Sequence, residues 1–401
     1  MESKKQGRLE YLDVAKGIGI VLVCIGHACT NQVVTAECQF ADIIRFVTLF
    51  HMALFFFING MLYNEKYSAR PVAGIWKKVK SYYIPFVTYN LLFWMFHNLF
   101  ARWNLISGEL DAKDYAYAGI RAWAVSFLKT ILGFRQRFAG AMWFLESLII
   151  ISVVFICVDF IVTKCFPKKR ILVLSVAITA IMLVNRLLCL YEIPHIPDSL
   201  TQMVYWGLNG LVFFYLGYLC RTYQWNERLV KKKNWLVPCL FLLLILSVIG
   251  MKPAIVSVIT NKSTPIYRYG MGALIGGADV YGLPLLQYVF YSVLCLCGIV
   301  MTLLFSQFKM ISESRILKLL GRYSLHIMCL QFLAFKAVSF LIVQIYHFPV
   351  ERLAEYPVVR DVNGFWWVLY AIAGCVLPVL AVRFYESLKT GIVKAYKGRK
   401  K

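Results

Sequence analysis

The sequence predicts an all-α fold, a polytopic membrane protein of about ten transmembrane helices. Three observations lead to this prediction. Of the 401 residues, 60% are hydrophobic and only 16% are charged, and the mean hydropathy is +0.67. A soluble domain has roughly 45–50% apolar and about 25% charged residues. Long apolar stretches recur along the whole chain, and the basic residues fall mostly between them.

Each stretch of about 20 apolar residues can cross the hydrocarbon core as a helix, because a lipid-embedded backbone must satisfy its own hydrogen bonds. The chain is therefore predicted to form one membrane domain over residues 1–401. Its transmembrane bundle covers residues 13–384, and residues 385–401 form a basic cytoplasmic tail. The predicted spans are residues 13–31, 41–63, 82–101, 141–163, 171–190, 203–220, 235–250, 283–306, 323–343 and 365–384.

The basic residues predict the orientation of the bundle. With the amino terminus inside, the inner segments carry 27 Lys and Arg residues and the outer segments carry 11. Cytoplasmic loops are enriched in Lys and Arg, so we expect both termini to be cytoplasmic and the protein to lie in a plasma or inner membrane. The net charge of +23 is spread over short clusters between spans. This distribution argues against nucleic-acid binding, which needs a continuous basic surface.

Two outer segments leave alternatives open. Residues 121–140 place apolar side chains beside Lys129, Arg135 and Arg137, a pattern typical of a helix lying on the outer leaflet. Alternatively, Arg135 or Arg137 lines a site for an anionic sugar or a lipid diphosphate. Residues 251–282 are rich in Gly and form either an external loop or a re-entrant segment.

The first predicted span, LDVAKGIGIVLVCIGHA, contains three ionisable residues. Charged groups are costly inside a bilayer, so these residues are candidates for a function within the bundle. Lys16 and His27 share a helix face within about 20°, with His27 about 16 Å further toward the outside. Asp13 lies one turn before Lys16 and can pair with it. Gly19 and Gly26 flank this face, where small residues allow a neighbouring helix to come close.

Three further polar residues lie within predicted spans. His51 and Asn59 belong to FHMALFFFING in the second span, and Glu146 belongs to MWFLESL at the outer end of the fourth. A neutral imidazole is a suitable base at physiological pH. A carboxylate orients an imidazole and stabilises its charged form. Because Glu146 and His27 lie at similar depths, we hypothesise that they pair.

The remaining polar residues of the spans give weaker signals. His326 and Gln331 lie at the cytoplasmic start of the ninth span, while Arg45, Arg186 and Lys336 are close enough to span ends to extend toward the headgroups. The chain has no P-loop, G-x-S-x-G or H-E-x-x-H motif, and its twelve cysteines are scattered singly. We therefore predict no metal site.

Taken together, these motifs resemble the integral-membrane acyltransferase family 3, especially its fucose 4-O-acetylase-like branch. In that family a basic residue of the first helix is followed, after ten residues, by a histidine; here these are Lys16 and His27. FHMALFFFING corresponds to F-H-M-P-L-F-F-F-I-S-G, and Trp143 begins the W-F-L motif. The motif G-K-N-S-L-x-I-Y-x-x-H starts here at Gly321. Its closing histidine falls on Gln331, to which we assign no catalytic role.

The resemblance implies an O-acyltransferase that moves an acetyl group from cytoplasmic acetyl-CoA to a hydroxyl of a lipid-linked or surface polysaccharide sugar. The expected partners are the lipid bilayer, the acyl-CoA and the sugar acceptor. His27 would act as a base or as a nucleophilic relay, with His51 and Glu146 as further catalytic candidates. The candidate substrate-binding residues are Lys16, Asp13, Asn59, Trp143, Arg135 and Arg137, and the candidates for binding the CoA phosphates are Arg70, Lys77, Lys78 and Arg322.

Two alternatives remain open at this point. A transporter or flippase of a sugar or lipid-linked oligosaccharide also needs many spans and buried polar groups, although the chain shows no matched pair of broken helices. The donor could also be a succinyl-CoA or a longer acyl-CoA, because the volume of the acyl pocket depends on the packing of the helices.

Overall fold

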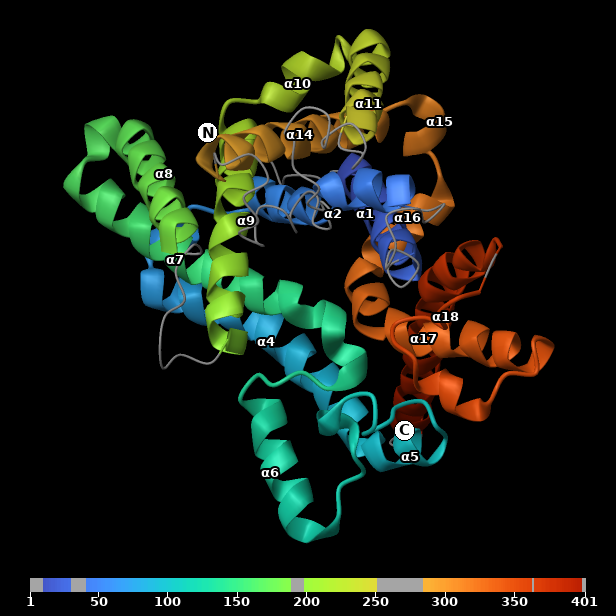
Figure 1. Ribbon diagram of the computed structural model, residues 1–401. Helices are drawn as coiled ribbons and strands as arrows, with labels where there is room; N and C mark the ends of the chain where they lie inside the picture. The colour runs from blue at the N-terminus through green and yellow to red at the C-terminus, as the bar shows by residue number, and fades with distance from the viewer. Residues whose placement is uncertain (1–9, 30–40, 189–197, 251–283, 363, 399–401) are drawn as a thin grey trace.

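The described part of the chain is mainly helical, and no strand occurs in it (Figure 1). The computed structural model describes residues 10–29, 41–188, 198–250, 284–362 and 364–398. The long helices are α1 (Glu10–Cys29), α2 (Ala41–Met61), α4 (Pro71–Met95), α6 (Gly119–Ile131), α7 (Trp143–Cys165), α8 (Arg170–Leu188), α9 (Asp198–Thr222), α11 (Lys233–Gly250), α14 (Pro284–Phe305), α17 (Ser324–Ile345) and α18 (Trp366–Gly398). The short ones are α3 (Lys66–Ala69), α5 (His97–Arg102), α10 (Trp225–Val230), α15 (Lys309–Ser312), α16 (Arg315–Arg322), and the 3-10 turns η2 (Ala112–Asp114), η3 (Arg137–Met142), η4 (Pro167–Lys169) and η5 (Val350–Ala354).

Local sequence signals explain where several helices begin and end. α4 starts at Pro71, which suits a first helical turn because its missing N–H has no helical partner there. α16 follows Ser314, whose hydroxyl accepts a hydrogen bond from the Leu317 amide at 3.3 Å. α4 ends at Met95, and Phe96 separates it from α5. The third predicted span, residues 82–101, is therefore not one continuous helix.

The number of membrane spans differs from the prediction of about ten. Six of the described helices are long and apolar enough to cross a membrane: α1, α2, α7 together with η3, α11, α17 and α18. The other predicted spans coincide with α4, α8, α9 and α14, which are helical but are shorter or less apolar over their described residues. The all-helical membrane fold is thus confirmed, and the count of ten is not.

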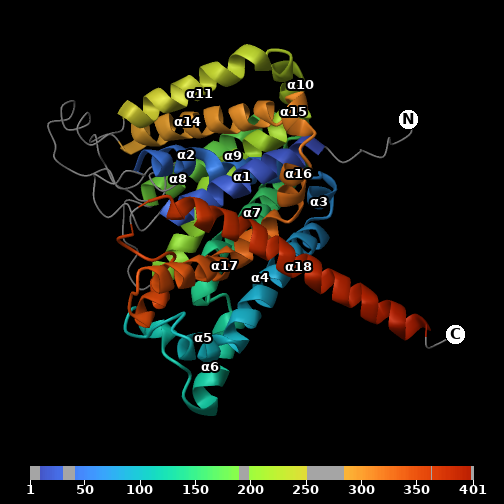
Figure 2. The ribbon, with the colours of Figure 1, turned by 90° about the vertical axis from the view of Figure 1, so that its right-hand side faces the viewer.

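The predicted outer and terminal segments are also refined. Of residues 121–140, the part up to Ile131 is helical in α6, and η3 begins at Arg137. The predicted tail, residues 385–401, continues α18 as far as Gly398, and this part of α18 extends beyond the bundle (Figure 2). α1 begins and α18 ends toward the same end of the molecule (Figure 2). Residues 251–282 lie outside the described residues.

α1 lies at the centre of the bundle, packed against α2, α16, α17 and α18 (Figures 1 and 2). α2 packs in turn on α9, α9 on α7, and α7 on α4. η3 lies between α17 and the α4–α7 pair and contacts all three helices. The helices that carry the sequence motifs, α1, α2, α7 and α17, are therefore neighbours through direct packing or through η3.

Glycines make two of these helix crossings possible. A Cβ at Gly17 would overlap the Leu317 carbonyl, and one at Gly321 would overlap the Asp13 carbonyl, so α1 and α16 approach with their backbones almost in contact. Gly60 faces the Phe214 carbonyl in the same way where α2 crosses α9. Only glycine permits this separation, as in other closely packed membrane helices.

The α1–α16 crossing leads to a stability prediction. The variant Gly321→Ala should destabilise the protein by about 1–3 kcal/mol, because the added methyl group forces the helices apart. Thermal unfolding of the purified protein in detergent measures the effect. Gly391→Ala in α18 is the matched control, since its Cβ meets nothing within 4 Å. Equal unfolding temperatures for the two variants would contradict this account of the crossing.

Candidate active site

His27 lies half-buried on α1 and faces α17. Its ring meets the ring of Phe332 edge-on, with centroids 4.8 Å apart. Within the described residues, neither ring nitrogen of His27 has a hydrogen-bond partner. The neighbouring Gly26 faces Val47 of α2, so α2 approaches α1 beside His27. Among the described residues, the imidazole is therefore held by apolar packing.

His51 is the second imidazole of the site and is buried on α2. Its Nδ1 lies 2.8 Å from the Val47 carbonyl, and since a carbonyl can only accept, Nδ1 carries the proton. In the neutral ring Nε2 then has the lone pair. His51 is close enough to His27 for the two rings to interact electrostatically. The structure thus brings together two of the three predicted catalytic residues.

Glu146, the third, is bonded elsewhere. No hydrogen bond or ion pair joins it to His27 among the described residues; its carboxylate instead lies 3.6 Å from Nε of Arg135. Glu146 is buried in the first turn of α7, and Arg135 also donates to the Gly140 carbonyl at 3.2 Å. The geometry makes Glu146 the partner of Arg135, while its pairing with His27 stays a hypothesis.

Arg137 also has carboxylate partners within the chain. Its NH1 donates to Asp111 at 2.7 Å, its Nε lies 3.3 Å from Asp114, and its guanidinium lies over the ring of Tyr356 at 4.5 Å. Both outer arginines, Arg135 and Arg137, are therefore paired with acids. This pairing weighs against the alternative in which they bind an anionic sugar or a diphosphate.

Asp114 is almost completely enclosed, with 2% of its surface exposed, and neither of its carboxylate oxygens accepts a hydrogen bond. Burial raises the pKa of Asp114 to about 6, against the opposing effect of the Arg137 charge. Asp111 behaves in the opposite way: burial works to raise its pKa, but hydrogen bonds and charge from Lys113 hold it below its usual range. The two carboxylates that share Arg137 therefore differ in proton affinity.

The remaining substrate-binding candidates lie in separate places. Trp143 meets Trp206 of α9 edge-on at 4.7 Å. Asn59 donates to the Phe55 carbonyl at 2.9 Å and accepts from the Tyr82 hydroxyl at 3.2 Å. Lys78 donates to that same hydroxyl at 3.3 Å, which links α2 to the first half of α4.

At the other end of α1, Asp13 is buried and lies 3.8 Å from Nε of Arg322, at the end of α16. Lys16 is half-buried and has contacts of its own, so the predicted support of Lys16 by Asp13 stays a prediction. Of the other CoA candidates, Arg70 and Lys77 are exposed, and Lys78 lies over the Tyr67 ring at 5.2 Å. The four proposed phosphate-binding cations therefore belong to two places, α4 and the α1–α16 crossing.

The structure contradicts the expectation that Lys336 reaches toward the headgroups. Lys336 is buried, with 4% of its surface exposed, and its ammonium group donates to the carbonyls of Leu353 and Glu355 at 2.6 Å each. These carbonyls belong to the segment after α17 that folds back over the helix. The sequence around Lys336 does not indicate that a later segment folds back over it. For this reason the position of Lys336 was predicted wrongly.

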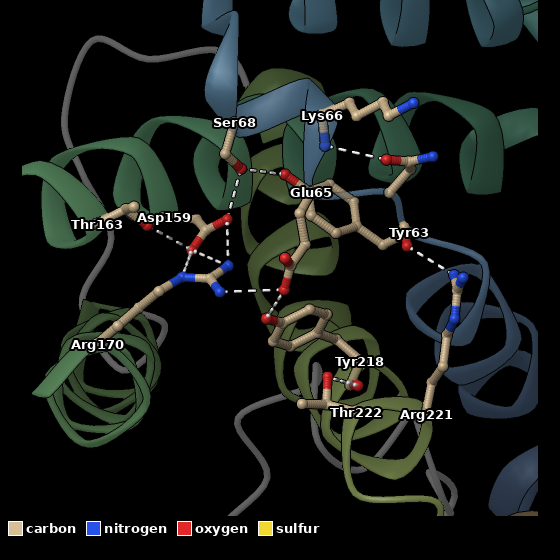
Figure 3. Close-up of polar contacts among 11 residues, drawn as sticks. Tyr63, Glu65, Lys66, Ser68, Asp159, Thr163, Arg170, Tyr218, Arg221 and Thr222 are labelled. Atoms are coloured by element: carbon tan, nitrogen blue, oxygen red, sulfur yellow. Dashed lines mark hydrogen bonds and ion pairs between the residues drawn. The ribbon is translucent and has the colours of Figure 1, made fainter. Parts of the chain in front are cut away.

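Sequence reasoning also missed a buried charge cluster around Asp159 (Figure 3). Asp159 of α7 is fully buried, and Arg170 at the start of α8 donates to both its oxygens, at 2.9 and 3.0 Å. Arg170 also binds Glu65 at 3.0 Å, and Glu65 accepts from Tyr218 of α9 at 2.6 Å. The available signal was an acidic residue inside an apolar span, the same signal that singled out Glu146.

A pocket of about 300 Å³ lies beside this cluster, lined by Glu65, Ser68, Ala69, Asp159, Phe160, Thr163, Lys164 and Arg170. Ser68 donates to Asp159 at 2.5 Å, so the carboxylate has four hydrogen bonds with Arg170 and Thr163 included. Since the acids and the guanidinium satisfy one another, we assign the cluster a structural role. It ties α7, α8 and α9 to the segment between α2 and α4, which includes α3.

Gln331 occupies the position at which the resemblance places a histidine. It is fully buried, and its Oε1 accepts a hydrogen bond from the Cys24 thiol at 3.4 Å, one turn before His27. Its Nε2 donates to the Met328 carbonyl at 3.3 Å. α17 therefore presents an amide and the aromatic ring of Phe332 to α1. No group of His, Cys, Asp or Glu suited to a metal ion occurs in the described residues.

Comparison with known proteins gives one match. A family described as an acyltransferase domain matches residues 9–384, nearly the whole chain. The matched region includes α1, α2, α7 and α17, which carry the residues described above. The comparisons with curated proteins and with solved structures give no significant match.

The charge cluster around Asp159 predicts a large loss of stability on mutation. Asp159 is fully buried, and Asp159→Asn leaves the half-buried Arg170 guanidinium without its main counter-charge, which should cost about 3–5 kcal/mol. Thermal unfolding of the purified protein in detergent measures this loss of stability. Glu10→Gln breaks the exposed ion pair with Lys318 and should change the unfolding temperature little. A similarly small change for Asp159→Asn would contradict the structural role of the cluster.

Asp114 predicts a pH dependence of stability. Because its pKa is raised from 3.8 to about 6, folding disfavours its ionisation, and stability present below pH 4 is lost as the pH rises through 6. Asp114→Asn should therefore remove a decline of about 2 kcal/mol between pH 4 and pH 7. Unfolding temperatures across this range measure the difference. Asp111→Asn is the control, since its lowered pKa predicts the opposite sign. An unchanged profile in Asp114→Asn would refute the assignment.

Proposed function

Because the chain belongs to this acyltransferase family, and is therefore a membrane acyltransferase, we propose that it transfers an acetyl group from cytoplasmic acetyl-CoA to a sugar hydroxyl. The acceptor is proposed to be a lipid-linked or surface polysaccharide. The observation that carries the proposal is the pair of imidazoles, His27 and His51, brought together from α1 and α2. Membership of the family favours an enzyme over the transporter considered from sequence, and the fucose 4-O-acetylase-like branch stays a prediction.

His27 is the proposed base. Its nitrogens have no protein hydrogen-bond partner among the described residues, so one can accept the proton of the acceptor hydroxyl. The hydroxyl oxygen then attacks the thioester carbonyl carbon, and the C–S bond breaks. CoA leaves as a thiolate and takes the proton from His27. The alternative route, in which His27 first accepts the acetyl group, uses the same atom as a nucleophile.

His51 is proposed to assist from α2. The Val47 carbonyl fixes the proton on Nδ1, so Nε2 keeps its lone pair and can accept a hydrogen bond. A backbone carbonyl that accepts a hydrogen bond from one ring nitrogen selects the tautomer of a histidine in this way. Each ring thus has a nitrogen that can accept a proton. The proposed reaction needs such nitrogens, because the proton of the acceptor hydroxyl must be bound and moved.

The donor is proposed to approach from the end of the bundle that carries Arg322 and the cytoplasmic part of α4. Arg70, Lys77, Lys78 and Arg322 provide cations for the phosphates of CoA. The hydrogen bonds from Lys78 to Tyr82 and from Tyr82 to Asn59 lead from this end toward α2. The polar pantetheine arm can exchange hydrogen bonds with such groups.

Replacing His27 tests the proposal. His27→Ala should lower acetyl transfer by about 100-fold or more, because a general base contributes that much to a reaction of this kind. Transfer is measured with radiolabelled acetyl-CoA, purified protein in lipid nanodiscs and a membrane glycan fraction as acceptor. The matched control is His347→Asn, which changes an exposed histidine between α17 and η5.

Three results separate the alternatives. Full activity of His27→Ala would remove His27 from the mechanism, and no transfer by the wild-type protein would refute the proposed function. Substituting succinyl-CoA or a longer acyl-CoA in the same assay identifies the preferred donor. A higher rate with one of these than with acetyl-CoA would replace the acetyl group in the proposal.

A further inference from the structure

Two consecutive residues of α17 hold α1 at two points that lie one helical turn apart. The side-chain amide of Gln331 accepts a hydrogen bond from the Cys24 thiol at 3.4 Å. The ring of Phe332 meets the His27 ring edge-on, with centroids 4.8 Å apart. Because Cys24 comes one turn before His27, its hydrogen bond restricts how α1 is rotated against α17 where the imidazole meets Phe332.

The amide of Gln331 is bonded at both of its ends. Its Nε2 donates to the carbonyl of Met328 at 3.3 Å, and the side chain is fully buried. A carbonyl can only accept, so this bond identifies Oε1 as the atom that faces Cys24. Breaking either bond would leave a buried polar atom without a partner, which is costly. The amide is therefore restricted to one orientation, and it brings no charge into the bundle.

Cys24 is enclosed from a second side by α18. A Cβ at Gly374 would stand 3.4 Å from the Cys24 sulfur and 2.5 Å from the ring of Phe335, so α18 comes close to α1 and α17 at this level. Cys24 itself is fully buried. The thiol thus lies between the Gln331 amide and the backbone of α18, and α1 has little room to rotate while the hydrogen bond is intact.

The orientation of His27 depends on this arrangement. Among the described residues, neither of its ring nitrogens is hydrogen-bonded, so the ring takes its orientation from the backbone of α1 and from packing. Phe332 is 3% exposed, and its ring packs on Phe335 and Tyr356 with centroids 6.1 and 4.9 Å apart. A rotation of α1 would therefore shift the imidazole against a ring that is fixed on its other sides.

We propose that Gln331 is a positioning residue for His27. Through the Cys24 thiol it fixes the rotation of α1, and so the place of the imidazole beside Phe332. The assignment rests on the proposed function, in which His27 accepts the hydroxyl proton, and deepens it by naming a residue that prepares His27 for this step. In this role Gln331 touches no substrate and moves no proton. A misplacement of about 1 Å can slow a reaction by about 100-fold, so a partial shift of the imidazole has a measurable effect on the rate.

The first experiment measures the position of His27 without any substrate. The chain has six histidines, so labelling with ¹³C-histidine gives six ring signals in the NMR spectrum, and the signal that His27→Ala lacks belongs to His27. Gln331→Leu should move this signal, because the ring current of Phe332 acts differently on a displaced imidazole. Gln307→Leu is the matched control, since the Gln307 amide joins Asn226 of α10 at 3.0 Å. An unmoved signal in Gln331→Leu, or equal shifts in the two variants, would overturn the assignment.

The second experiment measures the consequence for the reaction. Gln331→Leu should lower kcat for acetyl transfer about tenfold and leave the KM values of both substrates unchanged. The rates are divided by the amount of protein that binds acetyl-CoA, so a merely structural loss of enzyme would leave the corrected kcat unchanged. That result would overturn the positioning role. A raised KM would also overturn it, because it would show that Gln331 contacts a substrate.

The third experiment tests whether Gln331 acts through Cys24. Cys24→Val removes the donor and should lower kcat as much as Gln331→Leu does, with little further loss in the double variant. Cys24→Ser keeps a donor and should keep both the activity and the position of the His27 signal. Full activity of Cys24→Val, or multiplied effects in the double variant, would overturn the route through the thiol.

These experiments separate the inference from the proposed function. Gln331→Leu leaves no buried charge unpaired, and if it does not fold, Cys24→Val and Cys24→Ser carry the same NMR and kinetic tests. Absence of acetyl transfer by the wild-type protein would refute the proposed function. The NMR measurement would still decide whether Gln331 positions His27, because it needs no substrate and no activity.

Discussion

The close approach of α1 to α16 determines the geometry of the whole candidate site. Gly17 and Gly321 bring the two backbones almost into contact, and this fixes the position of α1 along its axis. His27 lies ten residues after Gly17, about 15 Å further along α1. α17 begins two residues after α16 ends, so the same crossing determines where Phe332 meets α1. A shift at the glycines would therefore move the imidazole relative to the ring that covers it.

Buried charges organise the rest of the bundle. Charged groups within spans are costly unless they are paired, and here Asp159 binds Arg170, Glu146 binds Arg135, and Lys336 binds two carbonyls. Each of these pairs joins a helix to a loop or to a neighbouring helix. His27 differs from them, because apolar contacts hold it and no hydrogen bond satisfies it within the described chain. His27 thus differs from the paired charges in its bonding, and this difference supports the proposal that it acts in the reaction.

Sequence periodicity predicted the helices that carry the motifs, but it did not predict which polar side chains pair. The 3.6-residue period and the apolar runs gave the helices of the motifs and the glycine-lined face of α1, and Gly19 does face α2. Depth alone suggested that Glu146 pairs with His27, but Arg135 lies closer along the chain and takes that carboxylate. Lys336 was misplaced because its partners belong to a segment that folds back after α17. Contacts between distant segments depend on how the helices cross. The spacing of residues along one helix does not predict these crossings.

The glutamine at position 331 shows how the chemistry is divided between helices. The family resemblance places a histidine there, but Gln331 is fully buried and bonded to Cys24 and to its own helix. The titratable rings of the site therefore come from α1 and α2, and α17 contributes Phe332. In the proposed mechanism, α1 and α2 therefore carry the groups that move the proton, while α17 contributes the Gln331 amide that binds Cys24 and the Phe332 ring that packs on His27.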